Sequence, residues 1–313
     1  MRVGIIGLGM VGKEILLNLY YFSGVQEIVV YDLNTERVTA EINDFEDTRA
    51  IPLNPHHKKL ILAKDYSELS DCSIVIINVG VKTQNMSDRI AILADNEALM
   101  KEIGPKVAQY SPNARVIITS NPVDAITYFF QKYSKMNPQH VIGSGTILDS
   151  ARLSLFLAKH YKVSELAINA WVLGEHGKTS FIPWSLVRIA GMSLSEFEKA
   201  SGISPINQKE TLERVIARGL EIFNTRGYTD HGIGASVFRL FTAIAQDEKA
   251  VLPVSCLFKG EYGIKDVRMG ALAIIGSEGI EKVLELPLED SALKAYHESA
   301  DFLKSAIEAL GKR

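Results

Sequence analysis

The sequence predicts an α/β protein in which a doubly wound parallel sheet is followed by an α+β domain. Three observations support this fold class. Apolar runs typical of strands alternate with helical patterns as far as Gly143. A glycine-rich turn joins the first run to the first helical stretch. The regular alternation stops after Gly143, so we expect one domain over residues 1–143 and a second over residues 144–313.

Composition and charge exclude several classes of protein. The chain has 313 residues, 47% of them hydrophobic, and a net charge of −3, which gives no electrostatic reason to bind nucleic acid or an anionic membrane. No apolar run is long enough to span a bilayer, and no signal peptide precedes the first strand. Cys72 and Cys256 lie far apart and favour a reducing compartment, so we expect a cytoplasmic protein. No Cys/His cluster has zinc spacing, and no metal is expected.

The first 32 residues carry a nucleotide-binding pattern. A β-rich run over residues 2–6 meets a glycine turn, then a helical pattern over residues 13–22, then a strand over residues 27–31 that ends at Asp32. Glycines let the backbone approach a pyrophosphate, which the free amides and dipole of a helix N-terminus favour. The Asp32 carboxylate can bind both hydroxyls of a ribose and would repel a 2′-phosphate, so NAD is favoured over NADP. This context predicts a Rossmann domain that binds NAD through Gly7, Gly9, Met10, Val11, Gly12 and Asp32.

The alternation then continues through the first domain. A helical pattern covers about residues 90–110, and further strands are expected over residues 60–63, 73–79, 115–119 and 140–143. Ligands of such sheets bind beyond the carboxyl ends of the strands, which draws attention to the segments that follow them.

Two of those segments hold candidate residues. A polar loop begins at Gly80, contains Thr83 and Gln84, and ends at Arg89. It is a candidate lid, although it fits equally an ordinary surface loop with a solvated Arg89. In the second segment, Pro122 restricts Asn121 to extended geometry and thereby directs its amide. The alternative is that Asn121 only caps the helix that starts near Asp124.

A histidine between glycines is the strongest candidate for acid–base chemistry. His176 lies in Gly174-Glu175-His176-Gly177, after an apolar run over residues 167–173 that we expect to be a strand. Histidine can move protons near neutral pH, but a turn histidine without a role is the simpler interpretation until partners are found.

Asp149 and Arg152 supply possible partners on a helix that runs to about residue 160. They are three residues apart and share one face. A structural ion pair explains this spacing. In the functional interpretation Asp149 holds His176, and Arg152 binds a substrate carboxylate through its planar guanidinium.

The second half lacks β–α alternation. Helical patterns cover residues 204–224, 235–245 and 291–310, and antiparallel strands are expected over residues 251–258 and 268–275. His231 is a second candidate proton donor. A position on a pocket wall or surface suits it better, because no acid stands at a supporting spacing.

Taken together, these segments resemble the L-lactate/malate dehydrogenase family over nearly the whole chain. The opening Ile-Gly-Leu-Gly and the Trp-Ser-Xaa-Val-Arg stretch after His176 look closest to the L-2-hydroxyisocaproate dehydrogenases and the bacterial L-lactate dehydrogenases. The matching pieces are the Gly7 to Gly12 turn with Asp32, the loop ending in Arg89, Ser-Asn-Pro-Val-Asp at Asn121, Leu-Asp-Ser-Ala-Arg at Asp149 and Arg152, Gly-Glu-His-Gly at His176, and Gly-Tyr-Thr at Thr229.

The resemblance implies an NAD-dependent L-2-hydroxy acid dehydrogenase that assembles as a homotetramer or homodimer. His176 would be the acid/base, oriented by Asp149, and Arg152 would grip the substrate carboxylate. Arg89 would arrive with the closing loop and polarise the substrate carbonyl. Other contacts are implied by position: to substrate from Asn121, Thr229, Thr83 and Gln84, and to cofactor from Gly80 and Asn121.

Departures from the family pattern concern the substrate pocket. Thr83 occupies the position where malate dehydrogenases carry Arg and lactate dehydrogenases usually carry Gln, although Gln84 is adjacent. Without a cation, a second substrate carboxylate would be desolvated at a cost of several kcal/mol, which disfavours malate. The shorter side chain favours an aliphatic group larger than methyl. Unusual residues at Lys178, Asp230 and His231 would also alter the pocket wall.

One further expectation and two alternatives follow from these motifs. Ser154 and Asn169 replace the Arg and His through which allosteric relatives bind fructose 1,6-bisphosphate, so no such site is expected. The Gly-Leu-Gly-Met opening is also similar to 3-hydroxyacid dehydrogenases, but those use a catalytic lysine and a largely helical second domain. A non-catalytic NAD-binding protein remains the alternative of another class, although such a protein has no use for a held proton donor.

Overall fold

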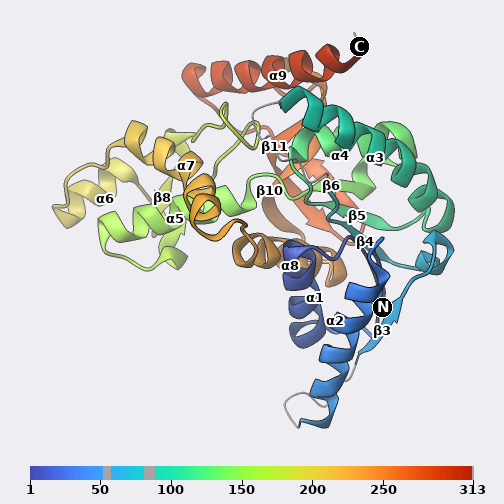
Figure 1. Ribbon diagram of the computed structural model, residues 1–313. Coiled ribbons are helices and arrows are strands. Elements are labelled where there is room, and N and C mark those ends of the chain that lie inside the picture. Colours follow the sequence, from blue (N-terminus) through green and yellow to red (C-terminus); the bar gives the residue numbers. More distant parts are fainter. Residues whose placement is uncertain (52–57, 81–88, 312–313) are drawn as a thin grey trace. The chain divides into compact units, whose positions relative to one another are not determined.

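The computed structural model of the protein describes residues 1–51, 58–80 and 89–311. The chain forms two compact units (Figure 1). The first unit contains Met1–Ser144, Asp230–Ala250 and Ile275–Glu281, and the second contains Gly145–Thr229, Val251–Ile274 and Lys282–Arg313. The domain boundary expected between residues 143 and 144 stays a prediction.

The first unit confirms the predicted doubly wound sheet. Six parallel strands lie in the order β6-β5-β4-β1-β2-β3, so the order reverses between β1 and β4. Val3, Ile5, Ile76 and Ile117 are completely buried, as expected where helices cover both faces. The strands are β1 Arg2–Ile6, β2 Glu27–Tyr31, β3 Lys59–Leu62, β4 Ile74–Ile77, β5 Arg115–Ile118 and β6 Val141–Gly143.

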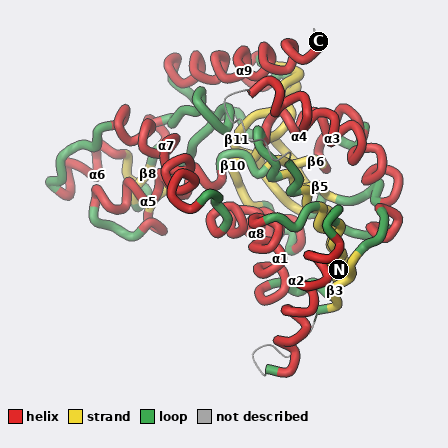
Figure 2. Tube along the Cα trace, in the orientation of Figure 1, coloured by secondary structure: helices red, strands yellow, loops and turns green. Residues whose placement is uncertain are grey.

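Helices connect these strands, as Figure 2 shows for the segments drawn in red and yellow. In this unit α1 packs against α8 and α3 against α4. The helix α2 begins where the Asn34 side chain accepts a hydrogen bond from the Arg37 amide. The helices are α1 Met10–Phe22, α2 Thr35–Asp47, α3 Arg89–Tyr110, α4 Val123–Ser134 and α8 His231–Ala245.

The second unit is built around helices and a small antiparallel sheet. Its order is β7-β8-β9, formed by Ile168–Asn169, Arg188–Ile189 and Met192–Ser193. Leu153, Val172 and Val215 belong to its buried core and are completely buried. The helices are α5 Ile147–Tyr161, α6 Leu194–Ser201, α7 Gln208–Arg226 and α9 Asp290–Gly311.

Three further strands follow α8 along the chain. They are β10 Ala250–Lys259, β11 Lys265–Gly276 and β12 Gly279–Val283, with β11 between the other two. The strands expected over residues 251–258 and 268–275 are therefore present, each slightly longer than predicted.

The strand expected over residues 167–173 is mostly absent. Regular pairing covers only Ile168–Asn169, and Leu173 makes an isolated bridge to Phe181. Side chains of α5 take the place of a neighbouring strand: the Thr146 hydroxyl donates to the Val172 carbonyl at 2.5 Å, and the Val172 amide donates to Ser150 Oγ at 2.9 Å. Val172 and Leu173 are buried, but the main chain of Val172 bonds to hydroxyl groups, which periodicity does not reveal.

Two helix starts also differ from expectation, for reasons of capping. The pattern over residues 204–224 becomes a helix only at Gln208, because Asn207 caps it by accepting from the Glu210 amide. The helix expected from residue 235 begins earlier, at His231, because Asp230 is its N-cap and accepts from the His231 amide.

Candidate active site

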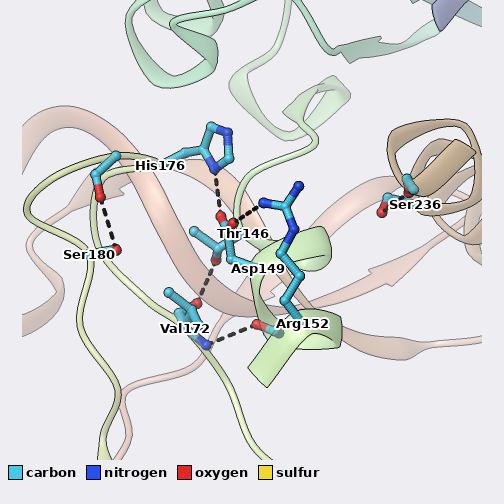
Figure 3. Close-up of polar contacts among 10 residues, drawn as sticks. Thr146, Asp149, Arg152, Val172, His176, Ser180 and Ser236 are labelled. Carbon is cyan, nitrogen blue, oxygen red and sulfur yellow. Dashed lines mark hydrogen bonds and ion pairs between the residues drawn. The ribbon is translucent and has the colours of Figure 1, made fainter. Parts of the chain in front are cut away.

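Asp149, Arg152 and His176 come together in the second unit. His176 Nδ1 lies 2.6 Å from Asp149 Oδ2, and Arg152 Nη1 donates to Asp149 Oδ1 at 3.0 Å (Figure 3). Because an ionised carboxylate only accepts hydrogen bonds, the Nδ1 of His176 carries the proton in this contact. The ion pair between Asp149 and Arg152, offered above as an alternative to a functional role, is present together with the histidine contact.

Helix α5 positions both charged members of this group. Asp149 lies in its first turn, and Arg152 follows one turn later on the same face. The hydrogen bonds between Val172 and the hydroxyls of Thr146 and Ser150 tie this end of the helix to the segment that leads into His176. The helix and the histidine turn are therefore held to each other by side chains that neighbour Asp149 in the sequence.

Burial strengthens the electrostatic interactions of Asp149 with Arg152 and His176. The Asp149 side chain is 9% exposed, Arg152 12% and His176 27%. Burial alone would raise the pKa of Asp149, but the adjacent charges and hydrogen bonds of His176 and Arg152 outweigh it and lower that pKa. Asp149 is thus an anion at neutral pH, and its negative charge favours the protonated imidazole.

Helix α7 leaves space beside the guanidinium. Gly219 lies in this helix, and a Cβ built there would meet Arg152 Nη1 at 3.4 Å. That distance is an ordinary van der Waals contact, so a methyl group would touch the guanidinium and a longer side chain would compete with it for space. The room around Arg152 therefore depends on a residue that lies 67 positions later in the chain.

The glycine turn of the first unit meets the steric requirements of a dinucleotide site. Gly7 has φ +94°, and a Cβ there would lie 2.4 Å from the Asn78 carbonyl oxygen. A Cβ at Gly12 would lie 2.3 Å from the Gly7 oxygen, whereas one at Gly9 meets nothing within 4 Å. These are the three properties expected of such glycines: a tight turn, close helix packing, and open space for a pyrophosphate. The first turn of α1 holds no acidic residue that would repel an anion.

Asp32 is fixed beside this turn at the end of β2. Its Oδ2 accepts from the Leu8 amide at 2.7 Å and its Oδ1 from the Asn34 amide at 2.8 Å. Arg37, on the first turn of α2, lies 3.7 Å from the same carboxylate and also donates to the Leu8 carbonyl. Arg37 was not predicted as a site residue. Its only signal in the sequence is its position five residues after Asp32, the predicted ribose contact.

Several predicted residues lie at or beyond the edge of what the structure describes. Thr83 and Gln84 fall outside the described residues, and Arg89 begins α3 with its side chain outside them. Gly80 is exposed after β4, and Asn121 is exposed before α4. The alternative in which Asn121 caps that helix is wrong: the N-cap is Pro122, with no side-chain hydrogen bond.

The unusual residues near Thr229 have structural partners. Thr229 is half-buried between the end of α7 and the start of α8. Asp230 caps α8, and the His231 Nδ1 lies 3.2 Å from Glu14 Oε2 while its side chain is 71% exposed. An acid does therefore stand beside His231, contributed by α1 from 217 positions away, where local spacing could not reveal it. Lys178 is exposed in the histidine turn.

Neither a candidate metal cluster nor a candidate membrane span is found among the described residues. Within residues 1–51, 58–80 and 89–311, no group of three or more His, Cys, Asp or Glu side chains could hold a metal ion. Among the helices that the structure describes, none is long and apolar enough to cross a membrane.

Comparisons with known proteins identify the family. The lactate/malate dehydrogenase NAD binding domain matches residues 1–143, and the alpha/beta C-terminal domain of the same family matches residues 146–312. An L-lactate dehydrogenase of Clostridium perfringens (strain SM101 / Type A) is 34% identical over 98% of this chain and 96% of its own. An L-lactate dehydrogenase of Lactobacillus delbrueckii subsp. bulgaricus is 36% identical over 99% of both chains.

A solved structure agrees with these matches. The crystal structure of a lactate dehydrogenase enzyme from a Medee basin deep-sea metagenome library superimposes with a TM-score of 0.94 at 27% identity, covering 99% of this chain and 98% of that one. Fold, glycine turn and family matches together define an NAD-dependent oxidoreductase of the 2-hydroxy acid dehydrogenase class. The chain belongs to the lactate/malate dehydrogenase family, and its cofactor is NAD.

Proposed function

We propose that this protein catalyses reversible hydride transfer between NADH and a monocarboxylic 2-oxo acid, either pyruvate or a longer homologue such as 2-oxoisocaproate, to give the L-2-hydroxy acid. One observation carries the proposal: a buried carboxylate, Asp149, contacts both an imidazole and a guanidinium. A proton donor beside an anion-binding fork suits a substrate that has a carbonyl next to a carboxylate. The L-lactate dehydrogenase relatives support the same reaction.

His176 is proposed to move the proton. Its Nδ1 is engaged by Asp149 at 2.6 Å, so the opposite nitrogen, Nε2, would give its proton to the substrate carbonyl oxygen. Asp149 orients the ring and stabilises the imidazolium before the transfer. Bound NADH supplies the hydride that adds to the carbonyl carbon.

Arg152 is proposed to bind the substrate carboxylate. Its guanidinium already donates to Asp149 through Nη1, which fixes the plane in which its other N–H groups point. Arg89 is proposed to polarise the carbonyl, and Asn121 to hydrogen-bond near the same oxygen. The remaining proposed contacts are Thr229, Thr83 and Gln84 to substrate, and Gly7, Gly9, Met10, Val11, Gly12, Asp32, Gly80 and Asn121 to NAD.

The proposed substrate preference rests on Thr83. A hydroxyl at this position cannot neutralise a second carboxylate, so oxaloacetate would lose its hydration without gaining an ion pair. A threonine is also shorter than the glutamine or arginine of relatives. We therefore propose that a branched aliphatic 2-oxo acid is accepted at least as well as pyruvate, and that malate formation is the weakest of these activities.

The test is a panel of 2-oxo acids with NADH oxidation followed by absorbance. Pyruvate and 2-oxoisocaproate should be reduced with saturating kinetics, and oxaloacetate should have a kcat/KM lower by about 10²-fold or more, as for an unpaired buried charge. Preference for oxaloacetate would overturn the substrate proposal in favour of malate dehydrogenase. NADH binding without turnover of any 2-oxo acid would favour a non-catalytic NAD-binding protein.

We propose a homotetramer or homodimer in the cytoplasm, with the two domains meeting in sequence between residues 143 and 144. The first segment of the first unit ends at Ser144, and the two family matches end and begin at residues 143 and 146, which supports this boundary. Light scattering on the purified protein measures the assembly directly.

A further inference from the structure

We propose that Ser299, on the C-terminal helix α9, is a positioning residue for His176. Its hydroxyl holds the turn formed by residues 174–180 in the shape that brings the imidazole to Asp149. The inference rests on the function proposed above, because it assigns a device that supports the proposed proton transfer. All of the residues that carry it belong to the second unit.

Ser299 is a polar residue on the buried face of an amphipathic helix. Tyr296, Ala300 and Leu303 lie on this face, and Ser299 itself is completely buried. A buried hydroxyl is unfavourable unless it finds hydrogen-bond partners. Its partners are both in the histidine turn: Ser299 Oγ accepts from the Glu175 amide at 3.1 Å and donates to the Thr179 carbonyl at 2.5 Å.

These two contacts lie on either side of His176. Glu175 precedes the histidine directly, and Thr179 follows it three positions later. The two are also joined within the turn, because Glu175 Oε2 accepts from the Thr179 amide at 2.9 Å and from its hydroxyl at 2.8 Å. Glu175, Thr179 and Ser299 thus form a closed ring of hydrogen bonds around the base of the turn, which restricts the path of the backbone through His176.

A second contact of α9 holds the start of the turn. Tyr296, one helical turn before Ser299, donates its hydroxyl to the Gly270 carbonyl at 2.9 Å. Gly270 and Gly174 exchange main-chain hydrogen bonds of 3.0 and 2.8 Å. Gly174 has φ +86°, and a Cβ there would lie 2.5 Å from Ser299 Oγ, so the turn lies against α9 without space for a side chain at this position.

The arrangement separates proton transfer from carboxylate binding. Ser299 acts on the turn that carries His176, whereas Arg152 lies on α5, which Ser299 does not contact in the hydrogen bonds described above. Loss of the Ser299 hydroxyl would let the turn shift and the imidazole leave Asp149, while the guanidinium keeps its place. The chemical step would slow, and the affinity for the 2-oxo acid would change little.

The experiment compares Ser299→Ala with Ser305→Ala in steady-state reduction of a 2-oxo acid by NADH. Ser305 is the matched control, since it is an exposed serine on the same helix. Ser299→Ala should lower kcat by about 10- to 100-fold, the range expected when a catalytic group is misplaced by about 1 Å, with KM changed less than about twofold. Ser305→Ala should match the parent. A Ser299→Ala enzyme with parental kcat would overturn the inference.

A double-mutant cycle distinguishes positioning from a general loss of structure. In the His176→Ala background, Ser299→Ala should cause no further loss of residual activity, because the group that it positions is gone. An equal loss in both backgrounds would overturn the inference. If Ser299→Ala does not fold, Ser299→Cys replaces it, because a thiol fills a similar volume but is a weak donor and acceptor. The cysteine variant should show the same loss of kcat to a smaller degree, and unchanged kcat would again overturn the inference.

A readout that needs no turnover separates this inference from the proposed function. The Nδ1 proton of His176, held by Asp149, should give a downfield NMR signal in the parent that is lost or shifted in Ser299→Ala but kept in Ser305→Ala. That result in a protein that reduces no 2-oxo acid would overturn the proposed function and leave the positioning role intact. An active parent whose signal is the same in both variants would overturn the positioning role alone.

Discussion

The glycine turn of the first unit and the histidine turn of the second both use glycine, but they solve different physical problems. In the first, Gly7 and Gly12 avoid side chains that would clash with the backbone of the turn, and Gly9 leaves the open space proposed for a pyrophosphate. In the second, Gly174 removes a side chain so that the turn can lie against α9, and Glu175, Thr179 and Ser299 then fix it with hydrogen bonds.

The difference lies in where the chemistry is carried. The nucleotide turn is proposed to act through main-chain amides and a helix dipole, so its function should survive most changes of side chain apart from those at glycine. The histidine turn serves one imidazole, whose value depends on a hydrogen bond of 2.6 Å to a buried carboxylate. Single substitutions should therefore have graded effects in the first region and severe effects in the second.

The largest expected effect is at His176. His176→Ala should lower kcat by about 10²- to 10⁴-fold, the usual contribution of a general acid. NADH binding, measured by fluorescence titration, should stay within about twofold of the parent, because the proposed cofactor contacts lie in the first unit. Near-normal turnover would remove His176 from the proton transfer.

Arg152→Lys should be the next most severe change. A lysine ammonium is a point charge that cannot replace a planar, bidentate guanidinium, and it would also lose the contact geometry with Asp149. We expect KM for the 2-oxo acid to rise by about 10²-fold, equivalent to roughly 3 kcal/mol of lost charge-assisted hydrogen bonding. Unchanged KM and kcat would mean that Arg152 serves only in the ion pair.

A moderate effect is expected in the nucleotide region, at Asp32. Asp32→Asn removes the charge that repels a 2′-phosphate and leaves Arg37, now 3.7 Å from the carboxylate, available to bind one. The ratio of kcat/KM for NADPH over NADH should rise by about tenfold, roughly 1.4 kcal/mol. A ratio that does not change would show that the first region selects NAD by some other contact.

The free energy of unfolding should depend on pH through Asp149, a buried charge of the second region. Its neighbours His176 and Arg152 overcome the effect of burial and lower the pKa of the folded carboxyl below the unfolded value of about 3.9. Between the folded and the unfolded pKa of Asp149, the unfolded state binds more protons than the folded state. The stabilisation from this carboxylate is therefore complete above about pH 4 and is lost as pH falls through the folded pKa.

Urea unfolding of Asp149→Asn at a series of pH values measures this contribution. The variant should be less stable than the parent by about 1–3 kcal/mol at pH 7, since it lacks hydrogen bonds to a charged group. The two proteins should converge as the pH is lowered below about 4. A difference that is the same at every pH would mean that the Asp149 charge does not contribute.

The last prediction is that a sugar phosphate has no effect on the activity. Fructose 1,6-bisphosphate should leave the half-saturating pyruvate concentration unchanged, because Ser154 and Asn169 offer no cation to its phosphates. A large drop in that concentration on addition of the sugar phosphate would contradict this. The parent enzyme without the effector is the control.

Local pattern determined the parts of this protein whose interactions are close in sequence. Period, glycine spacing and one acid at a strand end were enough to predict the parallel sheet, the NAD site at Gly7 to Asp32, and His176 as a candidate proton donor. The Asp149 and Arg152 pairing was also predictable, because residues three apart on a helix are neighbours. In each case the physical cause lies within about one supersecondary unit.

Tertiary structure alone decided the contacts between distant segments. Most of the strand predicted over residues 167–173 is absent, and Val172 is hydrogen-bonded to the hydroxyls of Thr146 and Ser150; Glu14 lies beside His231. Ser299 reached the histidine turn from 124 positions away. Such contacts depend on how packed elements bring distant polar groups together, and a buried hydroxyl finds its partner in space without leaving a period or spacing in the sequence.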